Sequence, residues 1–352
     1  MNPFRPLKYG LVLVQPIAVG VAFTQTGWWT WLPIGISFFF FPLIELFLKP
    51  RPENLDSAAR EVVSHDRIYD WILYLMVPIQ WGMMIWFFFS ISQPGLDILS
   101  LLGRVFSMGL LCGVLGINVA HELGHRPRRI EQNMAKLLLL TSQYMHFFIE
   151  HNRGHHRNVS TPEDPSSARL NEPVYFFWVR SVFKGYISAW RLESNRLKRM
   201  GLKPFSASNE MLRFFFFQLG LLLIIGYFFG EFVLNCYFVS ATIGFLLLET
   251  VNYIEHYGLV RKKVNENRYE SATPMHSWNS DHPIGRLVLF ELSRHSDHHY
   301  RPAKPYPLLD HHDESPQMPT GYPGMMLLSQ IPPLWFLVMN PRVRRIRSLS
   351  GS

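Results

Sequence analysis

Nine of the chain's 15 histidines gather in four short clusters, and their spacing indicates metal binding. The strings HELGH and HNRGHH place imidazoles four residues apart, so in a helix both rings share one face. HSDHH repeats the pattern, and NYIEHYG adds a single ring. Protonated rings at such spacing would repel one another, whereas a bound cation keeps them neutral and uses their lone pairs. We therefore predict nine metal ligands: His121, His125, His151, His155, His156, His256, His295, His298 and His299.

Nine imidazoles exceed the needs of a single ion. A structural zinc takes four ligands and usually includes cysteine, and a catalytic zinc takes three protein ligands and a water. Two five- or six-coordinate ions can share nine rings and keep open positions, which predicts a dinuclear centre. Nitrogen ligands suit iron, copper, nickel and zinc, and the absence of a thiolate together with the number of imidazoles favours iron. HELGH also matches the zinc-protease motif, but that motif needs a third ligand and an open peptide cleft.

Carboxylates stand beside the histidines, and a metal-bound imidazole usually donates its second nitrogen to such a group. Glu249 is the most informative of them, because it lies in an apolar stretch and shares a helical face with Asn252 and His256. For the exposed-looking Glu163, plain solvation is the better interpretation. We predict four residues that support the ligands without binding metal themselves: Glu249, Asn252, Glu255 and Asp297.

Long, nearly charge-free blocks predict an all-α integral membrane protein. Hydrophobic residues make up 48% of the chain, and crossing the hydrocarbon layer takes about 20 apolar residues in a helix. The first block lacks the cleavage pattern of a secretory signal, which predicts a retained anchor. We predict six transmembrane helices in three hairpins, at residues 9–23, 28–48, 68–90, 98–120, 214–229 and 232–253.

The basic residues predict how the chain lies in the membrane. The turns TQTG, SQPGLD and GE carry no Lys or Arg, so the positive-inside bias places both termini in the cytoplasm. Arg104 is an exception near the outer end of the fourth span, where it either snorkels or marks a later helix start. Residues 121–213 and 257–352 then form a cytoplasmic helical cap that holds the histidines, and residues 1–352 form one membrane-embedded domain.

Two parts of the cap have their own patterns. Residues 170–200 are mixed in polarity, which predicts an amphipathic helix on the cytoplasmic interface. The last apolar stretch, MMLLSQIPPLWFLVM, is broken by Pro332 and Pro333, so we expect it to be interfacial or to pack under the site.

Several strings resemble the integral-membrane alkane 1-monooxygenases, a branch of the membrane fatty-acid desaturase and hydroxylase superfamily. They include HELGHR, TPEDPSSAR, NYIEHYGL and RHSDHH, and the resemblance runs from about Leu115 to Met339. Arg126 stands where many members have lysine, which keeps the charge. The resemblance places the family's di-iron ligands on the nine histidines above. It implies an enzyme of the bacterial inner membrane that converts an n-alkane, O2, two electrons and two protons to a primary alcohol and water.

The resemblance also implies rubredoxin as electron donor, reduced by an NADH-dependent reductase. The chain has no glycine fingerprint for flavin or nicotinamide, and Cys112 and Cys236 cannot form an iron–sulfur centre. The net charge of +8 suits an acidic carrier, and it suits contact with anionic membrane lipid equally well. No aromatic-interleaved basic motif indicates nucleic acid. Candidate docking charges are Arg126, Arg128, Arg129, Arg294 and Arg301.

An n-alkane partitions into lipid, so we expect an apolar passage that opens to the bilayer and ends under the metal ions. Candidate lining residues are Trp28, Trp29, Phe38, Phe41, Trp81 and Trp86. Alternative functions are a related xylene or arylmethyl hydroxylase, a fatty-acyl desaturase, and a histidine-rich metal transporter that is not an enzyme. A transporter would place its ligands near mid-bilayer between broken helices, whereas these clusters lie at the cytoplasmic ends of spans.

Overall fold

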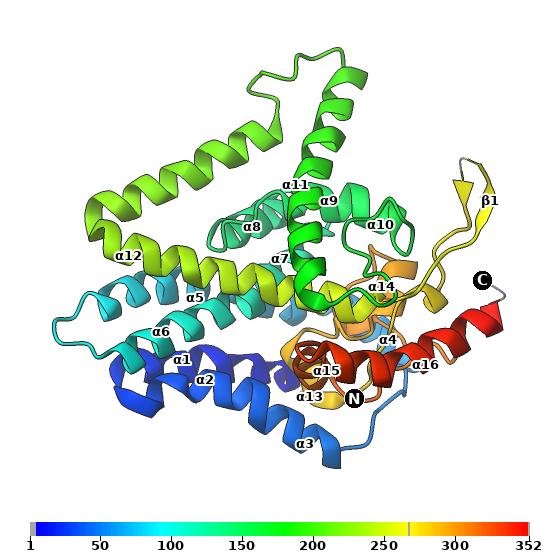
Figure 1. Ribbon diagram of the computed structural model, residues 1–352, viewed down its shortest axis with the longest axis horizontal. Coiled ribbons are helices and arrows are strands. Elements are labelled where there is room, and N and C mark those ends of the chain that lie inside the picture. Colours follow the sequence, from blue (N-terminus) through cyan, green and yellow to red (C-terminus); the bar gives the residue numbers. More distant parts are fainter. Residues whose placement is uncertain (1–4, 267, 351–352) are drawn as a thin grey trace.

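The computed structural model describes residues 5–266 and 268–350 and is almost entirely helical. Long helices run side by side along one axis, and shorter helices and loops form a cap at one end (Figure 1). Within the described residues, five helical stretches have the length and apolar composition of membrane spans. Their bounds are Arg5–Thr24, Gly27–Phe47, Ile68–Ile91, Ile98–Gly124 and Glu210–His256.

These candidate spans are built from regular and irregular helical pieces. Pro42 has no N–H to donate to the helical ladder, and the turn before it widens into the π-helix η3. In chain order the pieces are η1 (Arg5–Leu13), α1 (Val14–Thr24), η2 (Gly27–Trp31), α2 (Leu32–Gly35), η3 (Ile36–Phe40), α3 (Phe41–Phe47), α5 (Ile68–Ile91), α6 (Ile98–Leu111), η4 (Cys112–Ile117), α7 (Asn118–Gly124) and α12 (Glu210–His256).

The predicted helical class is confirmed in its coarser form, because the described residues are mostly helical and include five candidate membrane spans, whereas the predicted count of six spans is not confirmed. The segments predicted at 214–229 and 232–253 fall in one element, α12. Gly230 has a φ of 81° inside it, a left-handed conformation that glycine adopts without strain, and the helix changes direction there. Figure 1 shows the two arms of α12 diverging from this bend. How many crossings the arms make stays a prediction.

Arg104 neither snorkels nor marks a later helix start. It lies inside α6, which begins at Ile98, and its side chain is buried. The guanidinium donates hydrogen bonds to the carbonyl oxygens of Ala22, Gln25 and Ser90, at or near the ends of α1 and α5. These carbonyls lack helical partners, so a buried arginine stabilises the turn end of the bundle.

The cap is made of shorter elements that pack on the ends of the spans. Antiparallel β1 and β2 pair Lys263 with Tyr269 and Asn265 with Arg268. The cap elements are α4 (Ser57–His65), α8 (Arg129–Leu140), α9 (Phe147–Glu150), η5 (His151–His155), α10 (His156–Asn158), α11 (Val174–Arg199), β1 (Lys263–Asn265), β2 (Arg268–Tyr269), η6 (Pro274–His276), α13 (Pro283–Val288), α14 (His295–Tyr300), η7 (Tyr306–Leu308), α15 (Tyr322–Ser329) and α16 (Pro332–Ser350).

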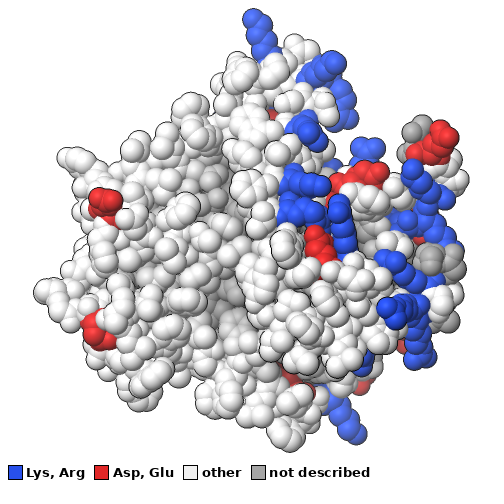
Figure 2. All heavy atoms as spheres, in the orientation of Figure 1, with Lys and Arg blue, Asp and Glu red and all other residues white. Residues whose placement is uncertain are grey.

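Two predictions about cap elements can be compared with the structure. The helix expected within 170–200 is α11, which buries Phe177 and Ala189 and exposes Phe176 and Phe183. The last apolar stretch divides into α15 and α16, and Pro332 begins the second because proline suits the first turn of a helix. Figure 2 shows Lys and Arg gathered at the cap end while the bundle surface on this face is almost uncharged. This distribution is typical of a protein whose bundle lies in lipid.

Candidate metal centre

The nine predicted ligands come together where the cap meets the bundle. They form two groups, and the potential ligand atoms within each group all lie within 4.8 Å of one another. Group 1 contains His121, His125, His151, His156 and His298, and group 2 contains His155, His256, His295 and His299. The elements that carry them are distant in sequence: α7, η5 with α10, the end of α12, and α14.

The ring nitrogens face one another at distances typical of shared coordination. In group 1, His156 Nε2 lies 3.1 Å from His125 Nε2 and 3.0 Å from His151 Nε2. In group 2, His295 Nε2 lies 3.1 Å from His256 Nε2. Imidazole nitrogens bind a metal ion at about 2.1 Å, so neighbouring ligands at right angles lie about 3 Å apart. The donor set therefore fits two metal ions, one in each group.

Burial keeps most of these rings neutral and so leaves their lone pairs free. It lowers the pKa of His125 to about 3 and holds the pKa of His151 and His156 well below its usual value. The pKa values of His295, His298 and His299 are lowered in the same way. Neutral imidazole is the form that binds metal.

His155 differs from the other rings. Burial disfavours its charged form, but the carboxylate of Asp164 overcomes this and raises the pKa of His155. The Asp164 Oδ2 atom lies 2.9 Å from His155 Nδ1 and also accepts a hydrogen bond from the Ser167 hydroxyl. This contact fixes the tautomer that leaves Nε2 directed at His299 Nε2, 3.2 Å away.

The second histidine cluster serves both groups. His151 and His155 have the spacing that predicts a shared helical face, yet they belong to different groups. The reason is local, because residues 151–155 form the π-helix η5, which has a wider turn. A Cβ atom at Gly154 would lie 2.6 Å from Glu150 Oε1, so a larger residue at this position would require the Glu150 side chain to move.

The predicted supporting residues lie at different distances from the rings. Glu255 Oε2 is 3.1 Å from His295 Nε2, and its other oxygen accepts a hydrogen bond from the Tyr322 hydroxyl at 2.8 Å. Glu249 accepts from the Tyr144 hydroxyl at 2.8 Å and lies 3.4 Å from the Asn252 amide. Both carboxylates are buried, and Asn252 lines the cavity described next.

Asp297 has a different environment. Among the described residues, its carboxylate accepts hydrogen bonds from the Lys304 ammonium group and the backbone N–H of Asp310, and it contacts the His312 ring. None of these groups is one of the nine rings, so Asp297 organises the loop after α14.

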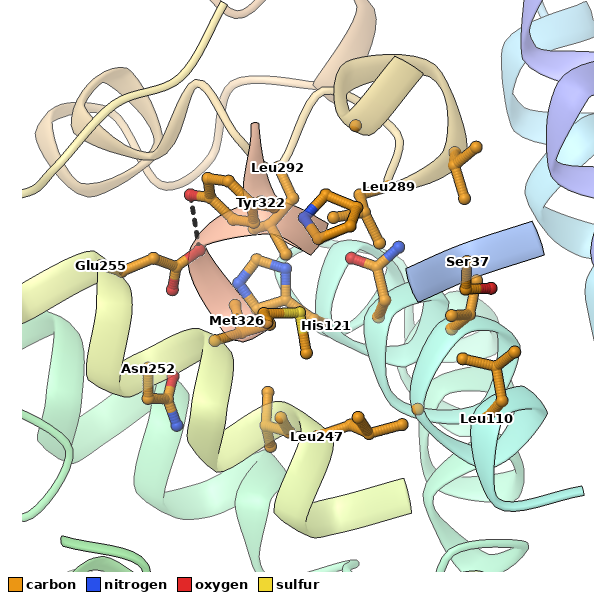
Figure 3. Close-up of a pocket in the computed structure, with 18 of the residues that line it drawn as sticks. Ser37, Leu110, His121, Leu247, Asn252, Glu255, Leu289, Leu292, Tyr322 and Met326 are labelled. Atoms are coloured by element: carbon orange, nitrogen blue, oxygen red, sulfur yellow. Dashed lines mark hydrogen bonds between the residues drawn. The ribbon is translucent and has the colours of Figure 1, made fainter. Parts of the chain in front are cut away.

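An apolar cavity adjoins the histidine groups. Its volume is about 90 Å³, and rings from both groups line its wall: His121, His151 and His295. Figure 3 shows His121, Tyr322 and Glu255 on one side and Leu110 and Ser37 on the other. Other lining residues are Phe38, Phe41, Val114, Leu247 and Met326.

The prediction of which aromatic residues line this cavity is only partly correct. Phe38 and Phe41 do line it. Trp28 and Trp29 are 78% and 61% exposed, and Trp86 is also exposed. Trp81 lines a separate hollow beside the first arm of α12. Tryptophans at the turns of a bundle face the surroundings, as interfacial aromatic residues do.

Known proteins with similar sequences can now be compared with this geometry. Residues 98–328 match the fatty acid desaturase family. Alkane 1-monooxygenase 2 of Pseudomonas aeruginosa is 40% identical over 322 residues, covering 90% of this chain and 84% of that relative. Alkane 1-monooxygenase 1 of the same organism is 42% identical over 307 residues, which cover 86% of this chain and 80% of that relative.

The chain belongs to the alkane 1-monooxygenase family. The resemblance predicted from the motifs is confirmed, and so is the enzyme class, an oxidoreductase. The hydroxylase component of xylene/toluene monooxygenase from Pseudomonas putida is 28% identical over 342 residues, covering 96% of this chain and 89% of that relative. The alternative arylmethyl hydroxylase is therefore a more distant relative than the alkane 1-monooxygenases.

Several residues of this alkane 1-monooxygenase site were not predicted. Tyr322 and Tyr144 hold the supporting carboxylates, and Gln15, Ser37 and Asn118 are polar groups on the cavity wall. Tyr322 lies 67 residues from Glu255 in the chain, and no spacing rule joins such a pair. The string PQMPTGYPGMML also resembles the alkane 1-monooxygenases, and it is the one signal in the sequence that points to Tyr322.

The candidate docking arginines differ in exposure. Arg128, Arg129 and Arg301 are exposed, and Arg126 is half-buried between Glu122 and Asp70. Arg294 is buried, pairs with Asp281 at 3.1 Å and donates to the Leu309 carbonyl oxygen. It cannot meet a partner protein, so its prediction as a docking charge was wrong.

Proposed function

We propose that this chain hydroxylates the terminal methyl group of n-alkanes, consuming O2, two electrons and two protons and releasing water. The observation that carries the proposal is the apolar cavity whose wall includes rings of both histidine groups. The alkane 1-monooxygenases to which the chain is similar support the same reaction.

The proposed cofactor is a pair of iron ions, one bound by the five rings of group 1 and one by the four rings of group 2. A neutral nitrogen donor set suits iron, and family membership supports this choice over copper, nickel or zinc. When bound, the iron ions supply the activation of O2 and the insertion of one oxygen atom into a C–H bond. The protein contributes ligand geometry, substrate orientation and exclusion of water.

The residues around the rings have proposed roles that do not involve binding metal. Asp164 fixes the tautomer and orientation of His155 through Nδ1. Tyr322 orients Glu255, whose Oε2 lies 3.1 Å from Nε2 of His295, the nitrogen that also faces His256. Glu249 and Asn252 hold the inner face of α12 together beneath the rings. Such contacts set the position and basicity of ligands. We do not extend this role to Asp297, because its bonds go to Lys304 and His312.

The substrate enters from lipid in this proposal. The cavity wall is mostly aliphatic and aromatic, so an alkane moves between two apolar surroundings and its hydrocarbon chain meets few polar groups. Phe38, Leu247 and Met326 are partly exposed lining residues from three different elements, which gives the cavity a wall that other molecules can approach from outside the bundle. The methyl end then lies beside His121, His151 and His295.

Electrons come from rubredoxin in this proposal, supplied in turn by its reductase. Exposed Arg128, Arg129 and Arg301 are the basic residues offered to this acidic carrier. We further propose six crossings of the bacterial inner membrane, with both termini, the cap and the histidines on the cytoplasmic side. The basic cap in Figure 2 supports this orientation. Residues 1–352 act as one domain.

Product analysis tests the proposed function. The purified protein, with rubredoxin, reductase and NADH, is given octane, xylene and an oleoyl lipid in separate reactions. We expect 1-octanol as the main product. Oxidation of xylene or desaturation of the lipid without 1-octanol would contradict the proposal and support one of the two alternative enzymes.

A further inference from the structure

Helix α11 carries two rows of side chains on its outer surface. Large apolar side chains, between 47% and 71% exposed, recur at steps of three or four residues and so share one face of the helix. They are Phe176, Val179, Phe183 and Ile187. A basic row follows the edge of this apolar face at steps of four and seven residues. It consists of Arg180, Lys184 and Arg191.

The basic row borders a pocket of about 350 Å³ between α11 and the loop at residues 162–165. Arg180 holds that loop against the helix. Its guanidinium pairs with Glu172 at 2.6 Å and donates hydrogen bonds to the carbonyl oxygens of Pro165 and Ser167. The charge of Arg180 is therefore neutralised within the protein, and its role is to form the wall of the pocket.

The other two basic residues of the row have no such partner. Lys184 and Arg191 line the same pocket, and neither forms an ion pair with any residue in the described ranges. The carboxylates of the loop are engaged elsewhere: Asp164 contacts His155, and Glu163 accepts a hydrogen bond from a tyrosine hydroxyl in β2. Two positive charges thus border the pocket without a counter-ion.

The position of α11 brings the two rows to the edge of the membrane-like surface. Figure 1 shows α11 running across the long helices, where the bundle meets the cap. In Figure 2 the Lys and Arg side chains begin where the uncharged surface of the bundle ends. A helix with an apolar face beside a basic edge is typical of the membrane interface, with the apolar side chains among acyl chains and the cations at the level of the phosphates.

We propose that the pocket beside α11 binds the phosphate group of an anionic phospholipid. Lys184 and Arg191 supply the counter-ions, and the acyl chains of the lipid lie along Phe183 and Ile187. The inference goes beyond the proposed function, because it needs neither turnover nor a metal ion. It assigns a second role to α11, which also packs against the elements that carry the histidines.

A lipid fits these two rows better than an acidic carrier protein does. A soluble protein bound at the cations would leave the apolar row in water, whereas a phospholipid meets both rows at once, its phosphate at one and its chains at the other. Basic residues next to an interfacial apolar face are also the usual signal for anionic lipid.

The first test uses the unaltered protein in dodecyl maltoside micelles. Dioleoyl phosphatidylglycerol, dioleoyl phosphatidylcholine and soluble glycerol 3-phosphate are titrated separately, and the rise in melting temperature gives each apparent affinity. We expect phosphatidylglycerol to bind about tenfold more tightly than phosphatidylcholine, which has no net charge, and glycerol 3-phosphate to have no effect. Equal affinities for the two lipids would overturn the proposal. Stabilisation by glycerol 3-phosphate equal to that by phosphatidylglycerol would overturn it too, because the ligand would then be a soluble phosphate.

The second test removes the two free charges. Lys184→Gln combined with Arg191→Gln should weaken phosphatidylglycerol binding about 30-fold, the joint effect of two basic residues beside an anionic headgroup. Lys262→Gln combined with Lys263→Gln is the matched control. It removes the same charge from exposed residues at the β1–β2 hairpin, which Figure 1 shows at the far end of the cap, and it should leave binding unchanged. Equal losses in both double variants would mean that only net charge matters, which overturns the site.

A third variant tests the apolar row. Phe183→Ser combined with Ile187→Ser keeps both cations and should also weaken phosphatidylglycerol binding, because the acyl chains lose their contact surface. Unchanged binding in this variant would contradict a lipid as the ligand.

The electron carrier is the competing partner for the basic row. If Lys184→Gln with Arg191→Gln binds phosphatidylglycerol normally but has a raised KM for rubredoxin, the row serves the carrier and the proposal is overturned. The binding measurements need no alkane oxidation, so a protein that makes no 1-octanol still decides whether α11 binds the lipid.

Discussion

The Asp164 carboxylate lies 2.9 Å from Nδ1 of His155, and both side chains are completely buried. Burial disfavours the charge on Asp164, but His155 and the Ser167 hydroxyl overcome this and lower the pKa of the carboxyl. The carboxylate thus stays ionised at neutral pH and holds one ring of group 2 in a fixed orientation. The first prediction follows from this contact.

Asp164→Asn should weaken metal binding in group 2. Removing the partner of a metal-bound imidazole typically lowers affinity or activity about 10- to 100-fold. We expect the iron content to fall toward that of group 1 alone, measured by plasma mass spectrometry on the purified protein. Asp313→Asn is the control, because Asp313 is fully exposed and contacts His311, which is outside both groups. Full iron content in Asp164→Asn would count against the role of this pair.

Glu249→Ala should also lower metal occupancy, because Glu249 holds other side chains in place on the face of α12 beneath the rings. The substitution leaves the Tyr144 hydroxyl without its acceptor and removes the partner of Asn252. Because buried hydrogen-bond networks are costly to break, we expect about 1–3 kcal/mol of lost stability as well. Iron content and melting temperature are measured together. Normal iron in a folded Glu249→Ala protein would contradict the assignment.

Phe38→Ala should extend the range of alkanes that the protein accepts. Phe38 lines the cavity from η3, so removing its ring lengthens or widens the available space. The measurement is the rate of alcohol formation across a series of n-alkanes. Trp28→Ala serves as the control, because Trp28 is 78% exposed and lies outside the cavity. If both variants keep the original profile, Phe38 does not limit chain length.

Glu291 should make stability depend on pH. Its carboxylate pairs with Arg286 and Lys8 and accepts a hydrogen bond from the Tyr9 hydroxyl at 2.7 Å. Burial alone would raise the pKa of Glu291, but Arg286 and Lys8 hold it below the usual 4.5. A carboxyl group with a lowered pKa stabilises the fold above its ordinary pKa and loses that contribution as pH falls through the lowered value.

The test of this prediction compares Glu291→Gln with the unaltered protein at several pH values. At pH 7 the variant should be less stable by about 2 kcal/mol, the value of hydrogen bonds to a charged group. Below pH 4.5 the difference should shrink as the glutamate takes up its proton. A constant difference between pH 7 and pH 4 would mean that the charge of Glu291 contributes nothing.

Some features of the site could be predicted because they depend on short-range spacing. The HELGH and HSDHH strings identified ligands on single helices, and all nine predicted rings come together. Their division into groups could not be predicted. His155 and His156 are adjacent in sequence yet belong to different groups, because the direction of each ring depends on the π-helical turn at 151–155.

Other features depend on contacts between distant segments. From its position along a span, Arg104 was predicted to snorkel or to mark a later helix start. Its actual partners are backbone carbonyl oxygens at the ends of two other helices. Gln15 has no partner in its own helix, and Ser37 comes from the next span. Gly230 shows the opposite case, since the GE turn was visible in the sequence and the structure has its non-helical bend at this residue.

The number of iron ions per chain tests the central claim most directly. The claim is that nine imidazoles, five in one group and four in the other, bind two ions beside an apolar cavity. Plasma mass spectrometry on purified protein that turns over an alkane should give two irons per chain. A value of one iron, or zinc in place of iron in the active protein, would contradict the account.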